Sequence, residues 1–254
     1  MVRVVEASTG ECQHRASVLL RGFPEHQRKH YVAHLATVEC YFVPIEYEHE
    51  VQHLSAKSRV HGNSLMKKNV ERCPWCLKDD IYMHYHDTVW GVPEHDDRNL
   101  FAKLCLDGAQ AGLSWYTILI RTEGYARAFD NWDAEKIARY TPKKIEKLLL
   151  DPGIIRNRQK VESVVKNAKA YLRIMEGGKG SFDDFLWKHT GHRTMVNQWK
   201  ELKQLPASTP ISDAMSKDLK KAGFSFVGST IVYAFMQACG MVDDHLVTCW
   251  RRTG

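Results

Sequence analysis

The stretch ERCPWCLKDDIYMHYHD (residues 71–87) has two cysteines near its start and a histidine near its end. Two residues separate Cys73 from Cys76, and His86 follows Cys73 after twelve intervening residues. Thiolates and imidazoles are the ligands that zinc prefers where its role is structural. A C-x-x-C pair is also typical of redox proteins, so this pair alone leaves the chemistry of the stretch open.

A second group of ligand-type residues lies near the end of the chain. Three residues separate His245 from Cys249, and on a helix this spacing would project both side chains from one face. A metal held between the two segments would join the ends of the intervening domain and contribute directly to its folding. Spacing alone does not decide whether Cys76 or Cys249 belongs to the ligand set.

The composition is that of a globular protein in a reducing compartment. The chain has 254 residues, of which 44% are hydrophobic and 26% are charged. It contains no apolar run long enough to span a membrane, and its start lacks the apolar core of a secretion signal. Seven irregularly spaced cysteines do not suggest a disulfide framework, so we expect a cytoplasmic protein. The net charge of +6 permits a polyanionic partner without requiring one.

The sequence pattern changes near residue 66. Residues 1–65 hold seven of the thirteen histidines and contain no recognisable motif. We therefore predict an N-terminal extension of unknown role over 1–65 and a folded domain over 66–254.

Capping signals and apolar periods predict a domain built almost entirely of helices. Residues able to cap a helix N-terminus precede several amphipathic stretches, namely Asp97, Asp133, Thr141, Ser181 and Asp213. A longer helix after DPG (151–153) is expected to end at Gly177, and a final apolar helix from Val227 to Cys239 is closed by Gly240. Strand-like alternation is almost absent, so the sequence predicts an all-α fold.

Four stretches between Glu71 and Cys249 resemble the DNA-3-methyladenine glycosylase I family, whose members are helix-hairpin-helix enzymes of DNA repair. They are ERCPWC (71–76), YMHYHDTVWGVPEHDDRNLFAKLCLDGAQAGLSW (82–115), DPGIIRNRQKV (151–161) and AMSKDLKKAGFSFVGSTIVYAFMQACGMVDDHLVTC (214–249). They occur in the order found in the family and together span about 180 residues. The resemblance implies the helix-hairpin-helix glycosylase fold and a monomer.

The resemblance also implies an activity. Enzymes of this family flip 3-methyladenine out of alkylated double-stranded DNA and hydrolyse its N-glycosidic bond, which leaves an abasic site. A lyase step would need a lysine nucleophile beside the pocket, and no motif points to one. We therefore expect a monofunctional glycosylase.

The family carries a structural zinc ion that joins the two ends of the domain. Its ligands are a cysteine near the start, the histidine of YHD, and the histidine and cysteine of D-H-x-x-x-C. On this chain the resemblance implies four ligands, Cys73, His86, His245 and Cys249. Cys76 then falls outside the ligand set.

The resemblance further implies an aromatic pocket for the damaged base, formed by Tyr82, Tyr85, Trp90 and Trp115. The N3-methylated adenine carries a positive charge, so electron-rich rings attract it by cation–π contact in addition to stacking. Because such a base is already a good leaving group, the pocket mainly has to recognise it.

Asp107 stands where the family pattern has a glutamate that accepts hydrogen bonds from the adenine edge. Aspartate keeps the charge and the acceptor but is one methylene shorter. We predict that Asp107 still reads the base. The alternative is a catalytically weakened protein that binds DNA or the base without efficient excision.

Two aspartates follow the last predicted helix. Many helix-hairpin-helix glycosylases use a catalytic aspartate in this neighbourhood, which makes Asp243 a candidate. Asp244 is predicted instead to orient the zinc-bound His245.

The stretch KKAGFSFVGST (220–230) resembles the hairpin with which the family binds DNA. Free amides at the start of the following helix suit a phosphate, and the lysines add positive charge. The expected DNA contacts are Lys220, Lys221, Gly223, Gly228, Ser229 and Thr230. Gly112 and Leu113 form a candidate wedge that fills the space left by the flipped nucleotide, with buried core as the alternative for Leu113.

Overall fold

A computed structural model of the protein describes residues 69–178 and 180–253. The predicted N-terminal extension, 1–65, lies outside the described residues. Within the described part the fold is mostly helical, as predicted, and none of its helices is long and apolar enough to cross a membrane.

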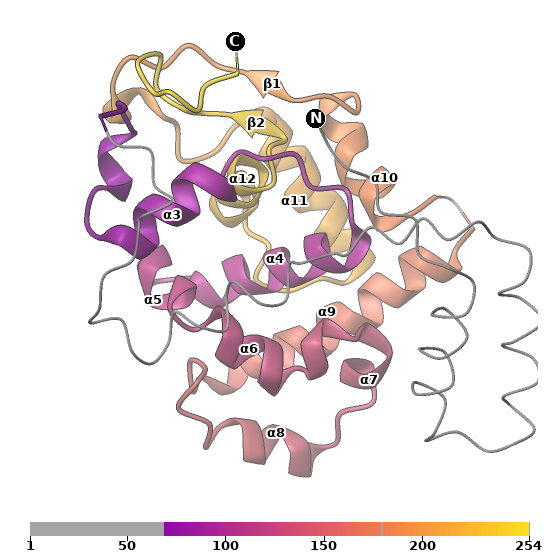
Figure 1. Ribbon diagram of the computed structural model, residues 1–254. Helices are drawn as coiled ribbons and strands as arrows, with labels where there is room; N and C mark the ends of the chain where they lie inside the picture. Colours follow the sequence, from indigo (N-terminus) through magenta and orange to yellow (C-terminus); the bar gives the residue numbers. More distant parts are fainter. Residues whose placement is uncertain (1–68, 179, 254) are drawn as a thin grey trace, which may run out of the picture. The chain divides into compact units, whose positions relative to one another are not determined.

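Most of the helices are short, and three longer ones, α4, α9 and α11, lie among them (Figure 1). The first half contains η2 (Pro74–Cys76), α3 (Asp80–Thr88), α4 (Asp97–Gln110), α5 (Trp115–Leu119), α6 (Thr122–Ala128), η3 (Asp130–Trp132), α7 (Ala134–Ala138) and α8 (Pro142–Leu148). The second half contains α9 (Arg158–Glu176), α10 (Phe182–Trp187), η4 (Lys188–Thr190), β1 (Met195–Val196), η5 (Leu202–Gln204), α11 (Pro210–Ala222), α12 (Ser229–Ala238) and β2 (Val242–Asp243).

Helix α4 is the centre of the domain. It contacts α5, α9, α10 and α12, and Figure 1 shows it crossing the middle of the molecule. Its predicted cap was one residue off, because Asp96 is the residue whose side chain accepts from the backbone N of Asn99. The carboxylate of Asp97 instead accepts from the backbone N of Asp183, at 2.7 Å, and so ties the start of α10 to α4.

Several predicted caps are confirmed. Asp133 and Thr141 cap α7 and α8, and Ser181 forms a capping box with Asp184 at the start of α10. The prediction for Asp213 was wrong. Thr209 caps α11 and Pro210 is its first residue, so Asp213 lies inside the first turn, where its charge favours the helix dipole.

The long helix α9 ends where the sequence predicted, with Gly177 as its C-terminal cap. Its buried stripe, which includes Val161, Val164, Val165 and Ala168, belongs to the main hydrophobic core. Because this helix contacts both α4 and α7, it joins the two sides of the domain.

Helices α11 and α12 form the predicted hairpin. Gly223 ends α11 with a positive φ of 100°, a conformation that favours glycine, and α12 begins at Ser229, two residues later than predicted. The side chain of Asn167 in α9 is buried against the turn. Its amide donates to the carbonyl oxygen of Ser225 at 3.1 Å and accepts from the Ser225 nitrogen at 2.7 Å. The hairpin is therefore held against the core by backbone-directed hydrogen bonds.

The predicted all-α fold is confirmed apart from one two-residue ladder. Strands β1 and β2 pair in parallel, with Met195 opposite Val242 and Val196 opposite Asp243. This short ladder directs the chain from the end of α12 toward the metal-ligand candidates that follow β2.

Gly124 in α6 has no room for a side chain. A Cβ atom there would overlap the carbonyl group of Gly153, in the turn between α8 and α9. Gly124→Ala is therefore expected to lower the free energy of unfolding by about 1–3 kcal/mol, because backbone atoms must move to make room for the Cβ.

Denaturant unfolding measures the effect of Gly124→Ala. Gly228→Ala is the matched control, because a Cβ at Gly228 meets nothing within 4 Å. Equal stability of the two variants would contradict the packing argument.

Candidate functional site

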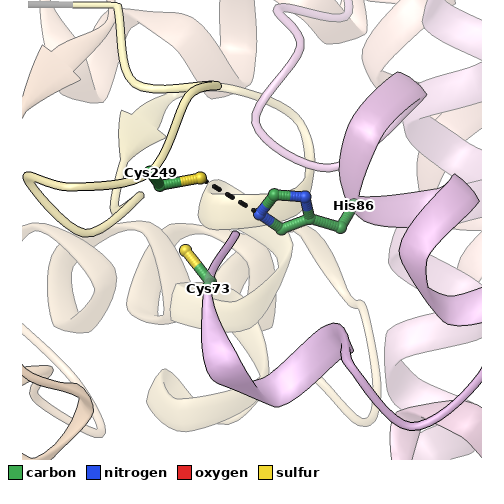
Figure 2. Close-up of side chains that lie close together, drawn as sticks. All are labelled: Cys73, His86 and Cys249. Atoms are coloured by element: carbon green, nitrogen blue, oxygen red, sulfur yellow. Dashed lines mark hydrogen bonds between the residues drawn. The ribbon is translucent and has the colours of Figure 1, made fainter. Parts of the chain in front are cut away.

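The cysteines and histidine predicted at the two ends of the domain come together in one buried cluster. Among the described residues, Cys73, His86 and Cys249 place their ligand atoms within 4.8 Å of one another. Figure 2 shows the three side chains pointing toward one another from the start of η2, from α3 and from the C-terminal segment. The cluster joins the two ends of the domain and can hold a metal ion.

His245 lies beside this cluster but outside the group of three. Its ring centroid is 5.0 Å from that of His86, and its Nε2 is buried with no hydrogen-bond partner among the described residues. A buried nitrogen without a partner is costly unless something binds it. The orphaned Nε2 therefore fits a fourth ligand better than it fits a core histidine.

Both histidines are oriented by a carboxylate on their other ring nitrogen. Nδ1 of His86 lies 2.9 Å from Oδ1 of Asp87, and Nδ1 of His245 lies 3.0 Å from Oδ1 of Asp243. The guanidinium of Arg72 holds the Asp87 carboxylate in turn. A carboxylate on Nδ1 leaves Nε2 to donate its lone pair, which is the usual arrangement of metal-bound histidines.

The carboxylate beside His245 is not that of Asp244, which was predicted to orient this histidine. The carboxylate that orients His245 belongs to Asp243, which also accepts from the backbone and hydroxyl of Thr253, at 2.8 and 2.6 Å. Burial by itself would raise the pKa of Asp243, but the hydrogen bonds from His245 and Thr253 lower it. Asp243 does not line the pocket described below, so the structure gives it an orienting position.

Asp244 anchors the segment from the other side. Its buried carboxylate accepts four hydrogen bonds of 2.6–2.8 Å, from Asn197, Trp199, Tyr233 and Gln237. This network links the region around β1 to α12, and it fixes the amide of Gln237.

Gly91 explains part of the motif HDTVWG (86–91). Its φ is +80°, and a Cβ there would lie 2.6 Å from Cε1 of His245. The backbone must pass this close to the imidazole, so the position suits only glycine.

A pocket of about 210 Å³ lies beside the cluster and is far larger than the roughly 30 Å³ that one water molecule occupies. All four predicted aromatic residues and Asp107 contribute to its lining. The full lining consists of Trp75, Tyr82, Tyr85, Trp90, Lys103, Asp107, Gln110, Trp115, Leu205, Ala234, Gln237 and Ala238.

The aromatic walls of the pocket rest on the histidines of the cluster. The Trp90 ring centroid lies 4.6 Å from that of His245, and the Trp75 centroid lies 5.3 Å from that of His86. Two further rings of the lining, those of Tyr85 and Trp115, have centroids 5.5 Å apart. The positions of the pocket walls therefore depend on the histidines at the cysteine–histidine cluster.

Asp107 is the acidic group of the pocket and is only 2% exposed. Its Oδ1 lies 2.5 Å from Nζ of Lys103, whereas its Oδ2 is buried with no partner among the described residues. Burial raises the pKa of Asp107 more than the nearby Lys103 lowers it. Burial, with a smaller contribution from Asp107, also raises the pKa of Tyr85 well above its usual value. Tyr85 therefore remains a neutral phenol near Asp107.

Sequence reasoning missed three informative residues of this lining, Trp75, Lys103 and Gln237. Trp75 stands between the two cysteines that drew attention to the motif. Lys103 precedes Asp107 by four residues, a spacing that brings side chains together on a helix. Gln237 is a polar residue near the end of an otherwise apolar helix, and that isolation was a usable signal.

The predicted wedge is accessible. Leu113 is 40% exposed, which disfavours the buried-core alternative, and Gly112 has a φ of +75°. Lys160 supports this turn from α9, because its Nζ donates to the carbonyl oxygens of Ala109 and Ala111 at 2.8 and 2.7 Å.

The hairpin residues predicted to contact DNA lie at one end of α11 and α12. Lys220, Lys221 and Thr230 are exposed, whereas the Ser229 hydroxyl is 2.8 Å from that of Ser212. The N-cap of α12 is Gly228, and no side chain of the described residues caps this helix. The first turn of α12 therefore keeps amides that no side chain satisfies, and such amides suit an anion.

Comparison with known proteins agrees with this geometry. A family model described as methyladenine glycosylase matches residues 75–252. DNA-3-methyladenine glycosylase 1 of Escherichia coli is 48% identical over 180 residues, which cover 71% of this chain and 96% of that protein. DNA-3-methyladenine glycosylase of Haemophilus influenzae is 49% identical, covering 70% of this chain and 96% of the relative.

Solved structures show the same fold. A crystal structure of 3-methyladenine DNA glycosylase I matches with a TM-score of 0.71 and 46% identity, covering 72% of this chain and all of that one. A structure of the Staphylococcus aureus enzyme, described as showing the basis of its 3-methyladenine recognition, matches with a TM-score of 0.69 and 37% identity. This match covers 72% of this chain and 97% of that one.

The fold and the pocket thus define a mostly helical DNA glycosylase. Within that class, the chain belongs to the methyladenine glycosylase family, represented by DNA-3-methyladenine glycosylase I.

Proposed function

We propose that this chain excises 3-methyladenine from alkylated double-stranded DNA by hydrolysing the N-glycosidic bond, and that it leaves an abasic site. Membership of the family makes the chain a DNA-3-methyladenine glycosylase. The single observation that carries the residue-level proposal is the pocket itself, in which a buried carboxylate lies among aromatic rings.

The pocket provides two kinds of recognition. Its rings offer flat surfaces on which a flipped base can stack, worth roughly 1–3 kcal/mol per base. The same rings attract a positively charged purine by cation–π contact. The unpartnered Oδ2 of Asp107 can accept a hydrogen bond from the amino group of adenine, and Tyr85 adds a neutral phenol.

Beyond binding the base, the protein has little to contribute to hydrolysis of the N-glycosidic bond. Methylation at N3 makes the base a good leaving group, so no strong acid has to protonate it. The protein's own residues bind the base, orient it and hold it outside the duplex while water attacks the sugar. Asp243 has no part in this scheme, because its carboxylate is engaged by His245 and Thr253.

The alternative is a weakened homologue that binds DNA or the base, suggested by Asp107 in place of the family glutamate. The buried position of Asp107 in the pocket lining favours the enzyme. Release of 3-methyladenine from alkylated DNA by the purified protein distinguishes the two.

Asp107→Asn tests the role of the carboxylate. A hydrogen bond to a charged group contributes about 1.5–3 kcal/mol, so excision should slow by roughly tenfold to a hundredfold. The rate is measured by single-turnover release of 3-methyladenine. Asp218→Asn is the control, because Asp218 is a half-exposed carboxylate in α11 that does not line the pocket. Unchanged excision by Asp107→Asn would remove Asp107 from the recognition site.

The metal of the buried cluster is proposed to be zinc. Two thiolates and two imidazoles, from Cys73, Cys249, His86 and His245, form the donor set that structural zinc prefers. The orphaned Nε2 of His245 and the carboxylates on both Nδ1 atoms support this assignment. Such an ion would tie the ends of the domain together and hold the two histidines under the pocket walls.

Cys249→Ser tests the zinc assignment against a close control. The variant should lose most of its bound zinc and unfold at a lower temperature, because metal binding contributes to folding. Cys76→Ser should keep its zinc, because the Cys76 thiol donates to the carbonyl oxygen of Cys73 and a serine hydroxyl can do the same. Zinc is measured by elemental analysis of the purified proteins. Equal zinc content in both variants would overturn the ligand set.

DNA binding is assigned to the hairpin and the exposed wedge. The lysines of α11 and the uncapped amides of α12 suit backbone phosphates, so this contact should be independent of sequence and sensitive to salt. We further propose that the chain acts as a monomer inside the cell, where its DNA substrate lies.

Leu113→Ala tests the wedge. The change should slow excision from duplex DNA by about tenfold, because nothing then replaces the lost stacking. Affinity for free 3-methyladenine should not change, since Leu113 does not line the pocket. Val196→Ala is the matched control, because Val196 is 41% exposed and lies in β1. Identical kinetics for the two variants would rule out the wedge.

A further inference from the structure

We propose that Lys103 is a specificity-determining residue of the pocket, which weakens binding of the positively charged base and speeds its departure. The proposal rests on the proposed function, since it concerns the charge of the excised base. Nζ of Lys103 lies in the pocket lining, and no sequence motif predicted its position there.

Lys103 occupies the place where a cationic base would be attracted. Its Nζ lies 2.5 Å from Oδ1 of Asp107 and 4.1 Å from the centroid of the Trp115 ring. The side chain is only 15% exposed, and it lines the pocket. The carboxylate and the ring face are the two groups that would attract a charged purine, and here a cation of the protein itself already engages both.

The net charge of the pocket lining is determined by Lys103 and Asp107. Among the described lining residues, Lys103 and Asp107 are the charged ones. Without Lys103 the lining would carry an unpaired anion that attracts a cationic base. With Lys103 the lining is neutral, and the incoming positive charge meets a like charge in a poorly solvated site, where repulsion is strong.

Bond cleavage relieves this repulsion. In DNA the N3-methylated adenine is cationic. When the C1′–N9 bond breaks, its electron pair goes to N9 and the base becomes neutral, while water adds to C1′ and gives up a proton to solvent. Positive charge thus moves from the base to the sugar in the transition state. A cation beside the base therefore destabilises the bound substrate more than the transition state, which raises the rate of cleavage.

The ion pair with Asp107 makes a nucleophilic role for Lys103 unfavourable. An amine that attacks C1′ needs a free nitrogen, and Nζ of Lys103 is held between Oδ1 of Asp107 and the face of the Trp115 ring. Borohydride should therefore trap no covalent complex between the full-length protein and its DNA product. A trapped complex that is lost in Lys103→Met would overturn the proposal.

The decisive experiment separates binding from cleavage. Single-turnover excision of 3-methyladenine from alkylated duplex DNA gives a half-saturating protein concentration and a maximal rate constant. Lys103→Met keeps the length of the side chain and removes its charge. It should lower the half-saturating concentration several-fold and reduce the maximal rate about tenfold, which is the signature of lost ground-state strain. Lys103→Arg should keep both values near those of the wild type.

Three controls make the outcome interpretable. Lys147→Met removes one charge from the exposed side of α8 and should change neither value. Lys103→Gln provides a second uncharged variant in case methionine impairs folding, and thermal unfolding verifies that each variant is folded. Lys103→Met/Asp107→Asn removes both charges and should return the half-saturating concentration toward the wild-type value.

The possible results are distinct. If the wild type releases no 3-methyladenine, the proposed function fails. If the wild type is active and Lys103→Met binds more weakly, or changes neither value, the role of Lys103 is wrong while the function stands.

Discussion

The structure depends on two imidazoles that serve two sites at once. His86 and His245 each place one nitrogen against a carboxylate. Nε2 of His86 lies 3.4 Å from Sγ of Cys249, and the ring of His245 lies beside that of His86. The faces of the same rings support Trp75 and Trp90 in the pocket. A buried imidazole is stable only when both of its nitrogens have partners, and a metal ion would be the partner of the second nitrogen. The cluster that joins the ends of the domain therefore also supports the aromatic walls of the pocket.

Helix α4 connects the pocket to the proposed DNA-binding side of the domain. Asp107 lies in the pocket, and its neighbour Gly108 is where the hairpin packs, since a Cβ at Gly108 would lie 3.1 Å from that of Phe226. Beyond its C-terminus, the turn that carries Leu113 is held by Lys160. One rigid helix thus sets the distances between the base pocket, the proposed wedge and the proposed phosphate contacts, so no hinge is needed to align them.

Most helices could be predicted from the sequence, because a capping residue and an apolar period are both encoded within a few neighbouring residues. The capping residue was predicted wrongly where two nearby side chains could each cap the same helix. Asp96 and Asp97 can both cap α4, and Asp213 yields to Thr209 because proline follows the threonine. In the site, the choice between Asp243 and Asp244 depends on how the chain turns after β2, which no local pattern encodes. The family resemblance predicted the aromatic residues and Asp107, but a lysine on a helix is normally solvated, so Lys103 was not noticed.

Asp107 and Lys103, which lies one turn earlier in α4, form an ion pair that compensates for the burial of the shorter acid. An aspartate keeps its charge closer to the helix backbone than a glutamate would, and in a buried site that charge needs a partner. Lys103 reaches it from the same helix, so the two groups pair without help from a ligand. A pocket that balances its own acid gains stability before any base enters. Lys103 thus reduces the attraction that the carboxylate and the rings exert on a cationic base, and the shape of the aromatic walls has to provide more of the discrimination.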